Sequence, residues 1–222
     1  DTQAIAKAIA AELVHAGPVE IGLAAGKRFI PELESSPYPQ GEISLSPGDV
    51  VVVTGGARGV TAASAYALAA YTKPTLILLG RSPHPAPEPS WISGLRDEPA
   101  IKKAILENEL TGKRPSPVEL EKAFKAHMAN REISENLERL KQTGSTVAYY
   151  SADVRDFHGV NSVFEEVRST YGPIKGIIHG AGTLEDRLII DKTPEQFEKV
   201  FDTKVRGLKV LLEATEQDDL SY

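Results

Sequence analysis

The sequence contains no cysteine. Without thiols the chain can form neither a disulfide nor a thiolate-bound metal site, and cysteine-based catalysis is excluded. We predict no metal site, and a location in the reducing cytoplasm. An excess of basic residues is also missing, because 25 Lys and Arg stand against 31 Asp and Glu, for a formal net charge of -6. This charge gives no support to a role in nucleic-acid binding.

Long hydrophobic runs are missing as well. No apolar stretch approaches the ~20 residues that a membrane-spanning helix needs, so we predict no membrane span. Residues 1–17 (DTQAIAKAIAAELVHAG) lack the basic segment and following apolar block of a signal peptide. This segment instead predicts a helix that is ended by Gly17 and Pro18. The composition, 41% hydrophobic and 25% charged, is ordinary for a globular protein.

The chain divides by composition into a small first part and a larger second part. Residues 18–33 contain two short alternating runs on either side of Ala24, Ala25 and Gly26, which predict a hairpin of two strands. Residues 38–48 are rich in Pro, Ser and Gly and are typical of a linker. We therefore predict a small unit over residues 1–37 and a main domain over residues 49–222.

The main domain carries four short apolar runs separated by helical patterns. The runs are nearly continuous, as expected for parallel strands that are covered on both faces. They lie at residues 50–54, 75–80, 146–151 and 174–180. The helical patterns lie at residues 60–71, 157–171 and 194–215. This alternation predicts an α/β fold with a doubly wound, Rossmann-type parallel sheet.

A long insertion, at about residues 84–144, separates the second and third predicted strands. It begins with a proline-rich loop, and a short helix is predicted near residues 99–110. Ser116, Pro117 and Glu119 then have the spacing of a capping box, which predicts a helix running to about residue 142, with Gly144 placed to end it. We expect its second half to pack on the sheet and its first half to project. A docking surface for another domain is the alternative.

The loop after the first strand of this domain has the pattern of a phosphate-binding loop. It reads TGGARGV, and its residues are Thr54, Gly55, Gly56, Ala57, Arg58, Gly59 and Val60. Backbone N–H groups at the start of a helix bind anions, and glycine lets a pyrophosphate approach closely. Thr61 takes the place of a third glycine that usually serves the packing of helix on strand, so its presence should cost packing rather than phosphate binding. A tight turn without a ligand is the alternative.

The second strand ends in Gly80, Arg81 and Ser82, without the acidic residue that commonly binds the ribose 2′-hydroxyl of NAD. Arginine can instead form a bidentate contact with a 2′-phosphate, and serine can donate a hydrogen bond. These residues favour NADP(H) over NAD(H) as the cofactor. Arg58 can add a second positive charge, although a solvated loop arginine is the alternative.

The ends of the third and fourth strands complete the predicted cofactor site. Asp153 can accept a hydrogen bond from an adenine amino group, and Val154 can lie against the ring. A helix cap, at Asp153 or at Asp156, is the alternative. The fourth strand ends in the small residues Gly180, Ala181 and Gly182, which leave room for a ribose and a nicotinamide.

The segments TGGARGV, LLGRS, ADVRD and HGAG follow one another as they do in the short-chain dehydrogenase/reductase family. They resemble in particular the ketoreductase domains of multidomain polyketide and polyunsaturated fatty acid synthases. Three further segments are similar to these domains: GKRFIPEL (26–33), HGAGTLEDRLI (179–189) and FDTKVRGLKVLLEAT (201–215). The resemblance also identifies residues 1–37 as the C-terminal remnant of the structural subdomain that precedes such ketoreductases.

The resemblance implies an activity with its cofactor and partners. The expected reaction is the NADPH-dependent reduction of a β-ketoacyl group, carried on acyl carrier protein, to the β-hydroxyacyl group. Other domains of the synthase are expected in the same polypeptide. The alternative is a catalytically silent, ketoreductase-like module with a structural or binding role.

The resemblance also assigns roles to four residues. Lys204 matches a lysine that synthase ketoreductases carry where other family members have asparagine. It is expected to bind the nicotinamide ribose and to lower the pKa of a catalytic tyrosine through its charge; a surface lysine beside Asp202 is the alternative. Leu184, Glu185 and Asp186 match a Leu-Asp-Asp motif that accompanies D (3R) alcohol products, and here the alternative is a charged surface loop. The lysine argues against an extended-type epimerase.

In the family that this sequence resembles, the catalytic serine and tyrosine lie beyond the helix predicted at residues 194–215, on the next strand and helix, and the sequence ends before them. Ser221 and Tyr222 are adjacent, whereas the family's pair is separated by a longer stretch, so we do not identify them with that pair. We therefore interpret the sequence as the front part of a longer protein, and we expect its sheet to be C-terminally incomplete. The 222-residue chain by itself is expected to bind NADPH weakly or not at all and to be inactive.

Overall fold

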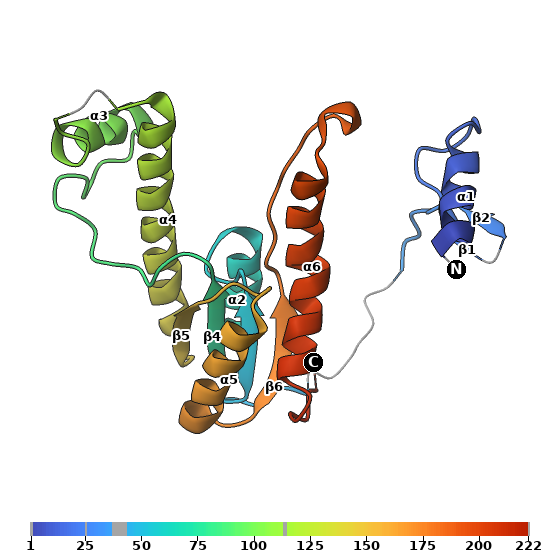
Figure 1. The fold of residues 1–222 in the computed structure, drawn as a ribbon. Helices are drawn as coiled ribbons and strands as arrows, with labels where there is room; N and C mark the ends of the chain where they lie inside the picture. Colours follow the sequence, from blue (N-terminus) through green and yellow to red (C-terminus); the bar gives the residue numbers. More distant parts are fainter. Residues whose placement is uncertain (1, 25, 37–43, 113–114, 222) are drawn as a thin grey trace. The chain divides into compact units, whose positions relative to one another are not determined.

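The computed structural model describes residues 2–24, 26–36, 44–112 and 115–221 (Figure 1). The chain divides into two compact units, Asp1–Ile43 and Ser44–Tyr222. Residues 38–43 of the predicted linker and Ala25 of the predicted hairpin lie outside the described residues.

The first unit contains a helix and a hairpin. Helix α1 (Thr2–Glu12) precedes strands β1 (Gly22–Ala24) and β2 (Lys27–Phe29), which pair antiparallel as predicted. The helix ends at Glu12 rather than at the predicted Gly17, and the chain turns at residues 13–14. Nδ1 of His15 donates a hydrogen bond back to the carbonyl of Ala11 at 2.8 Å. Arg28 of β2 donates a hydrogen bond from Nε to Glu12 at 2.8 Å, which joins the hairpin to the end of the helix.

The second unit is built on four parallel strands. They are β3 (Val50–Thr54), β4 (Thr75–Gly80), β5 (Val147–Ser151) and β6 (Ile174–His179). Their order in the sheet is β5-β4-β3-β6, and every neighbouring pair is parallel. The chain therefore adds β4 and β5 on one side of β3 and then places β6 on the other side of β3. In such sheets a ligand binds beyond the carboxyl ends of the strands at this reversal point, here between β3 and β6.

Helices cover both faces of this sheet (Figure 1), which confirms the predicted doubly wound fold. Helices α2 (Gly59–Thr72) and α4 (Pro117–Lys141) bury one face, and α5 (Phe157–Tyr171) and α6 (Pro194–Ala214) bury the other. Successive valines of β3 alternate between the two cores: Val51 and Val53 face α2 and α4, and Val50 and Val52 face α5 and α6. Both faces of the sheet are buried, which explains why the strand sequence is continuously apolar.

The insertion folds into α3 (Glu98–Asn108) and α4. The capping box is present, because the Ser116 side chain accepts a hydrogen bond from the backbone N–H of Glu119 and the Glu119 carboxylate accepts one in return. Ile133, Leu137 and Leu140 in the second half of α4 are buried in the core beside the sheet. The first half carries α3 and projects away from the sheet (Figure 1), as predicted.

The connection between β6 and α6 contains a short 3-10 helix, η1 (Ile189–Asp191). A second capping box then starts α6, with Thr193 accepting a hydrogen bond from the backbone N–H of Gln196. Among the residues that the structure describes, no helix combines the length and the apolar character needed to cross a membrane.

Candidate functional site

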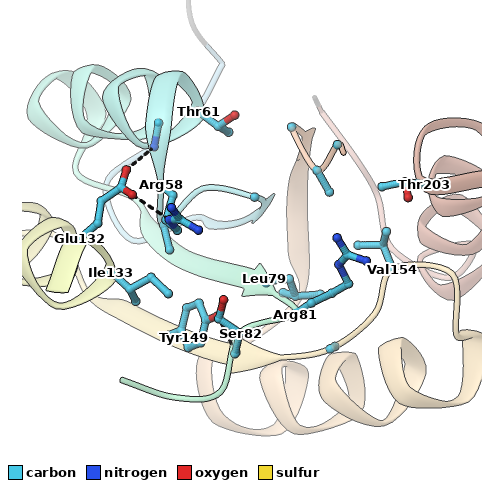
Figure 2. A pocket seen from close by; sticks show the side chains of 18 of the residues that line it. Arg58, Thr61, Leu79, Arg81, Ser82, Glu132, Ile133, Tyr149, Val154 and Thr203 are labelled. Carbon is cyan, nitrogen blue, oxygen red and sulfur yellow. Dashed lines mark hydrogen bonds and ion pairs between the residues drawn. The ribbon is translucent and has the colours of Figure 1, made fainter. Parts of the chain in front are cut away.

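A cavity of ≈ 610 Å³ opens at the carboxyl ends of the strands, where the chain reverses between β3 and β6 (Figure 2). The residues that line it come from the end of every strand, from the start of α2, and from α4 and α6. They are Gly55, Ala57, Arg58, Gly59, Thr61, Leu79, Gly80, Arg81, Ser82, Glu132, Ile133, Tyr149, Ala152, Val154, Gly180, Ala181, Gly182, Leu184 and Thr203. Most of the residues predicted from the four strand ends therefore meet in one place.

The glycines of the loop between β3 and α2 differ in what a side chain would meet at each position. Gly55 has a φ of +70°, and a Cβ there would lie 3.0 Å from the backbone N of Ala181, so only glycine lets the loop approach the end of β6. A Cβ on Gly56 would lie 2.6 Å from Cγ1 of Val53, and Gly56 does not line the cavity. Gly59 has a φ of +59° and nothing within 4 Å of its Cβ position, so its surface is open to a ligand.

Thr61, which replaces the third glycine, packs directly on Gly180. A Cβ built on Gly180 would lie 2.6 Å from Oγ1 of Thr61 and closer still to its Cγ2. The space that a glycine on α2 would supply is therefore supplied by a glycine after β6. This arrangement offsets the packing cost that the sequence predicts for Thr61.

The start of α2 carries a contact that the sequence did not predict. The Gly59 N–H donates to Oε1 of Glu132 at 2.8 Å, and Nε of Arg58 donates to Oε2 at 2.7 Å (Figure 2). Burial opposes the charge of Glu132, but these hydrogen bonds outweigh it and hold the pKa of the carboxyl below its usual value. No sequence signal marks Glu132, because it lies 73 residues beyond its partner Gly59.

At the end of β4, the predicted cofactor residues Gly80, Arg81 and Ser82 all line the cavity. Tyr149 of β5 joins them, and its hydroxyl donates to the Ser82 carbonyl at 2.8 Å. A Cβ on Gly80 would lie 2.8 Å from this hydroxyl oxygen, so glycine makes room for the tyrosine. Burial raises the pKa of Tyr149, although the charge of Arg58 opposes the shift. The sequence placed Tyr149 in a strand but not in the site.

The two cofactor contacts predicted after β5, Asp153 and Val154, lie in different surroundings. Val154 lines the cavity, whereas Asp153 does not. The Asp153 carboxylate accepts a hydrogen bond from Nη2 of Arg155 at 2.7 Å, and these hydrogen bonds lower the pKa of Asp153. Asp156 caps α5 by accepting from the backbone N–H of His158. The helix cap is therefore Asp156, one of the two positions that the sequence left open.

Beyond β6, the predicted cofactor residues Gly180, Ala181 and Gly182 all line the cavity. Lys204 of α6 lies beside them, because Nζ would be 3.5 Å from a Cβ on Gly182, although Lys204 itself is not a lining residue. Of the predicted stereocontrol residues, only Leu184 reaches the cavity.

Glu185 is turned toward α6 and forms an ion pair with Lys199, whose hydrogen bond lowers the pKa of Glu185. Asp186 is exposed and lies outside the lining. These two carboxylates therefore do not reach the cavity.

The family model of the KR (ketoreductase) domain matches residues 49–222. The chain belongs to the KR domain family. It is a ketoreductase domain of the polyketide synthase type within the short-chain dehydrogenase/reductase family, as the sequence resemblance indicated.

Relatives of this KR domain are parts of very long proteins. A polyunsaturated fatty acid synthase from a Thraustochytrium species is 34% identical over 193 residues, which cover 83% of this chain and 7% of that protein. Polyketide synthase PksN of Bacillus subtilis is 26% identical over 94% of this chain and 3% of that protein. The chain thus spans less than a tenth of the length of these relatives. Among solved structures, an N-terminal ketoreductase from the macrolactin assembly line matches with a TM-score of 0.59 and 26% identity, over 87% of this chain and 30% of that one.

In this KR domain, His179 at the end of β6 joins the glycine-loop strand to α6. Thr54 donates from its hydroxyl to Nδ1 of His179 at 2.8 Å and accepts from the Ala181 N–H at 3.1 Å. Nε2 of His179 then lies 3.1 Å from the carbonyls of Thr203 and Lys204, to which it donates. Burial, together with the charge of Lys204, lowers the pKa of His179, so the ring is neutral with its proton on Nε2. Thr54, predicted as a cofactor contact, is therefore a buried anchor of this network.

The remaining predicted cofactor residue is Val60, which is exposed and does not line the cavity. Thr203 and Ile133 line it instead, and the sequence did not point to either.

Acid is expected to destabilise the KR domain through His179. The folded pKa of His179 lies below the unfolded value of about 6.5, so the unfolded chain binds the proton more readily. The stabilisation is complete above pH ~6.5 and is lost as the pH falls through the folded pKa. Urea unfolding from pH 8 to pH 5 should show a steeper loss in the wild type than in His179→Gln. His158→Gln, an exposed substitution on α5, is the control and should keep the wild-type pH dependence; equal slopes for all three proteins would contradict the assignment.

Proposed function

We propose that this KR domain holds NADP(H) in the cavity between β3 and β6 and takes part in the reduction of a β-ketoacyl group carried on acyl carrier protein. The observation that supports the cofactor most directly is the pair of guanidinium groups, Arg58 and Arg81, lining one cavity whose β4 end carries no carboxylate. A 2′-phosphate is a dianion for which such groups are suited.

The residues present fit the cofactor. Gly59 leaves open space at the start of α2, where backbone N–H groups favour a pyrophosphate. Ser82 adds polar atoms beside Arg81 at the end proposed for the 2′-phosphate. Val154 is the proposed apolar support of the adenine, with Asp153 as its polar neighbour. The small residues Gly180 to Gly182 leave space for the ribose and nicotinamide.

The proposed chemistry divides between cofactor and protein. When bound, NADPH supplies a hydride from C4 of its nicotinamide. Lys204 holds the ribose beside Gly182, and its ammonium lowers the pKa of the tyrosine that protonates the product oxygen. His179 positions Lys204 by bonding the backbone carbonyl of that residue. Leu184, at the cavity mouth, contacts the substrate, and Glu185 and Asp186 flank it; a D (3R) product is the proposed outcome.

Residues outside the cofactor-binding part also have proposed roles. Residues 1–37, which the family model does not match, are proposed as the C-terminal remnant of a structural ketoreductase subdomain. The synthases that resemble this chain are multidomain proteins, which supports further synthase domains in the same polypeptide.

A catalytically silent binding module is the second candidate function. Tyr149 is the only tyrosine that lines the cavity among the described residues, and its hydroxyl donates a hydrogen bond to the Ser82 carbonyl. Within the described part of the chain, no other tyrosine is therefore available at the cavity as a proton donor. This observation supports both the silent module and an enzyme that receives its tyrosine from further sequence.

The 222-residue chain is expected to bind NADPH more tightly than NADH, by roughly tenfold from one charge-assisted contact to the 2′-phosphate, and to reduce neither trans-1-decalone nor an acetoacetyl thioester. Binding can be followed by NMR titration, which tolerates weak affinity, and reduction by NADPH absorbance. Equal affinity for the two cofactors would refute the 2′-phosphate site. Measurable reduction would show that the chain contains its own proton donor. The enzyme and the silent module are separated by the same assay on the complete synthase polypeptide, in which only the enzyme reduces the thioester.

A further inference from the structure

Helix α4 of the insertion contacts the glycine loop through one of its faces. Glu132 accepts hydrogen bonds from Gly59 and Arg58, as described above. One turn further on, Asn136 donates from Nδ2 to the carbonyl of Ala57 at 3.0 Å. Ile133, between them, is buried and lines the cavity. The insertion is therefore part of the wall of the proposed cofactor site.

The same part of α4 also holds the segment that follows Ser82. Asn130 forms two hydrogen bonds with the backbone of Ala86, at 2.8 and 2.9 Å. Arg131, whose side chain is only 12% exposed, donates to the carbonyls of Leu95 and Ile92 at 2.9 and 3.1 Å. Helix α4 is thus fixed by its neighbours, and the position of Glu132 at the loop follows from this fixation.

Glu132 occupies a position with the character of an anion site. Arg58, the N-cap of α2, makes no side-chain capping bond, so the first N–H groups of this helix have no local partner. The start of a helix favours negative charge through both its free N–H groups and its dipole. The Glu132 carboxylate satisfies the Gly59 N–H and at the same time pairs with the Arg58 guanidinium. It uses donors that the proposed function gives to the phosphates of the cofactor.

A phosphate and this carboxylate cannot share those donors. The hydrogen bonds keep the Glu132 carboxyl ionised at neutral pH, so the two groups repel each other as well as compete. The Glu132 side chain is 39% exposed, which gives it a path into solvent while the backbone of α4 stays fixed.

We propose that Glu132 is an internal substitute for the cofactor phosphates, which holds the start of α2 while the site is empty and is displaced by the pyrophosphate of the bound cofactor. This inference rests on the proposed function for the identity of the anion. Displacement of Glu132 then opposes binding, so the carboxylate lowers the affinity for every ligand that carries a pyrophosphate. A different role, in which Glu132 stays in place and orients Arg58, predicts the opposite effect on NADPH.

The test compares Glu132→Gln with the wild-type chain, using inorganic pyrophosphate, NADPH and NADH as probes. Glu135→Gln removes the same charge from an exposed position three residues further along α4 and is the matched control. Dissociation constants come from NMR titrations that follow the Gly59 amide. Removing the competing charge should lower the dissociation constants of all three ligands about tenfold. The control should change these constants less than about twofold.

The possible results separate the inference from the proposed function. Unchanged or weaker pyrophosphate binding in Glu132→Gln, or no pyrophosphate binding to either protein, overturns the inference. Weaker NADPH binding with unchanged NADH binding overturns it in favour of the orienting role. Tighter pyrophosphate binding without a preference for NADPH supports the inference and counts against the proposed cofactor.

A second measurement needs no substitution and covers the case in which Glu132→Gln does not fold. Saturating the wild-type chain with pyrophosphate should shift the side-chain carboxyl carbon signal of Glu132 as its bonds to Gly59 and Arg58 break. Glu135 serves again as the control and should not shift. A Glu132 signal that stays constant while the Gly59 amide responds would contradict displacement.

Discussion

Replacing Arg81 by aspartate is expected to weaken NADPH binding by the KR domain roughly 100-fold or more, while NADH binding changes by less than about threefold. A hydrogen bond to a charged group contributes about 1.5–3 kcal/mol, and each 1.4 kcal/mol corresponds to about tenfold in affinity. The aspartate also places a repelling charge next to the 2′-phosphate. The NADH molecule has hydroxyls at that position, with which aspartate can form hydrogen bonds.

The measurement is a pair of NMR titrations of the variant and the wild-type chain with the two cofactors. Arg96→Asp is the control, because Arg96 is an exposed arginine of the insertion and does not line the cavity. It makes the same charge reversal and should leave the ratio of the two affinities at the wild-type value. If Arg81→Asp weakened the binding of NADPH and NADH equally, the proposed contact between Arg81 and the 2′-phosphate would be contradicted.

Replacing Gly180 by alanine is expected to destabilise the domain by about 1–3 kcal/mol, the usual range for overpacking. The new methyl group would meet Thr61 at 2.6 Å or less and the carbonyl oxygen of Thr54 at 3.0 Å. Neither neighbour can move freely, since Thr61 lies in the first turn of α2 and the other atom is backbone. The change in the free energy of unfolding can be measured by urea denaturation.

A double-mutant cycle identifies the cause of this destabilisation. Thr61→Ala removes both atoms that approach Gly180 most closely, so Thr61→Ala/Gly180→Ala should recover most of the lost stability. Thr61→Ala alone is the control and should change stability by less than about 1 kcal/mol. Simple additivity of the two substitutions would show that Gly180 is required for a reason other than contact with Thr61.

In the glycine loop, local sequence patterns predict the helix start but not the residue that packs against it. The sequence places Gly59 at a helix start after a buried strand, and the structure confirms both elements. It assigns Thr61 to packing, but the partner that accommodates it, Gly180, is found only in the structure. A helix start and its glycines are encoded within a few residues, whereas the packing partner comes from a strand that is distant in the chain.

At the strand ends, too, the sequence predicts which segments meet but not the direction of each side chain. Arg81 and Val154, from different strand ends, line the same cavity, because parallel strands bring their carboxyl ends to one edge of the sheet. Asp153, on the same segment as Val154, instead pairs with Arg155. The direction of a side chain in a loop depends on the partners available, and the pattern of the strand does not specify it.

The sequence by itself determined the order of the strands and helices along the chain, the doubly wound class and most of the residues that meet at one edge of the sheet. These follow from apolar runs, capping residues and glycines, all of which act over short stretches of chain. Only the tertiary structure decided that His179 joins Thr54 to α6 and that Glu132 lies on the start of α2. The path of the long insertion sets the second contact, since a fixed helix delivers a carboxylate to Gly59 that no local pattern connects with it.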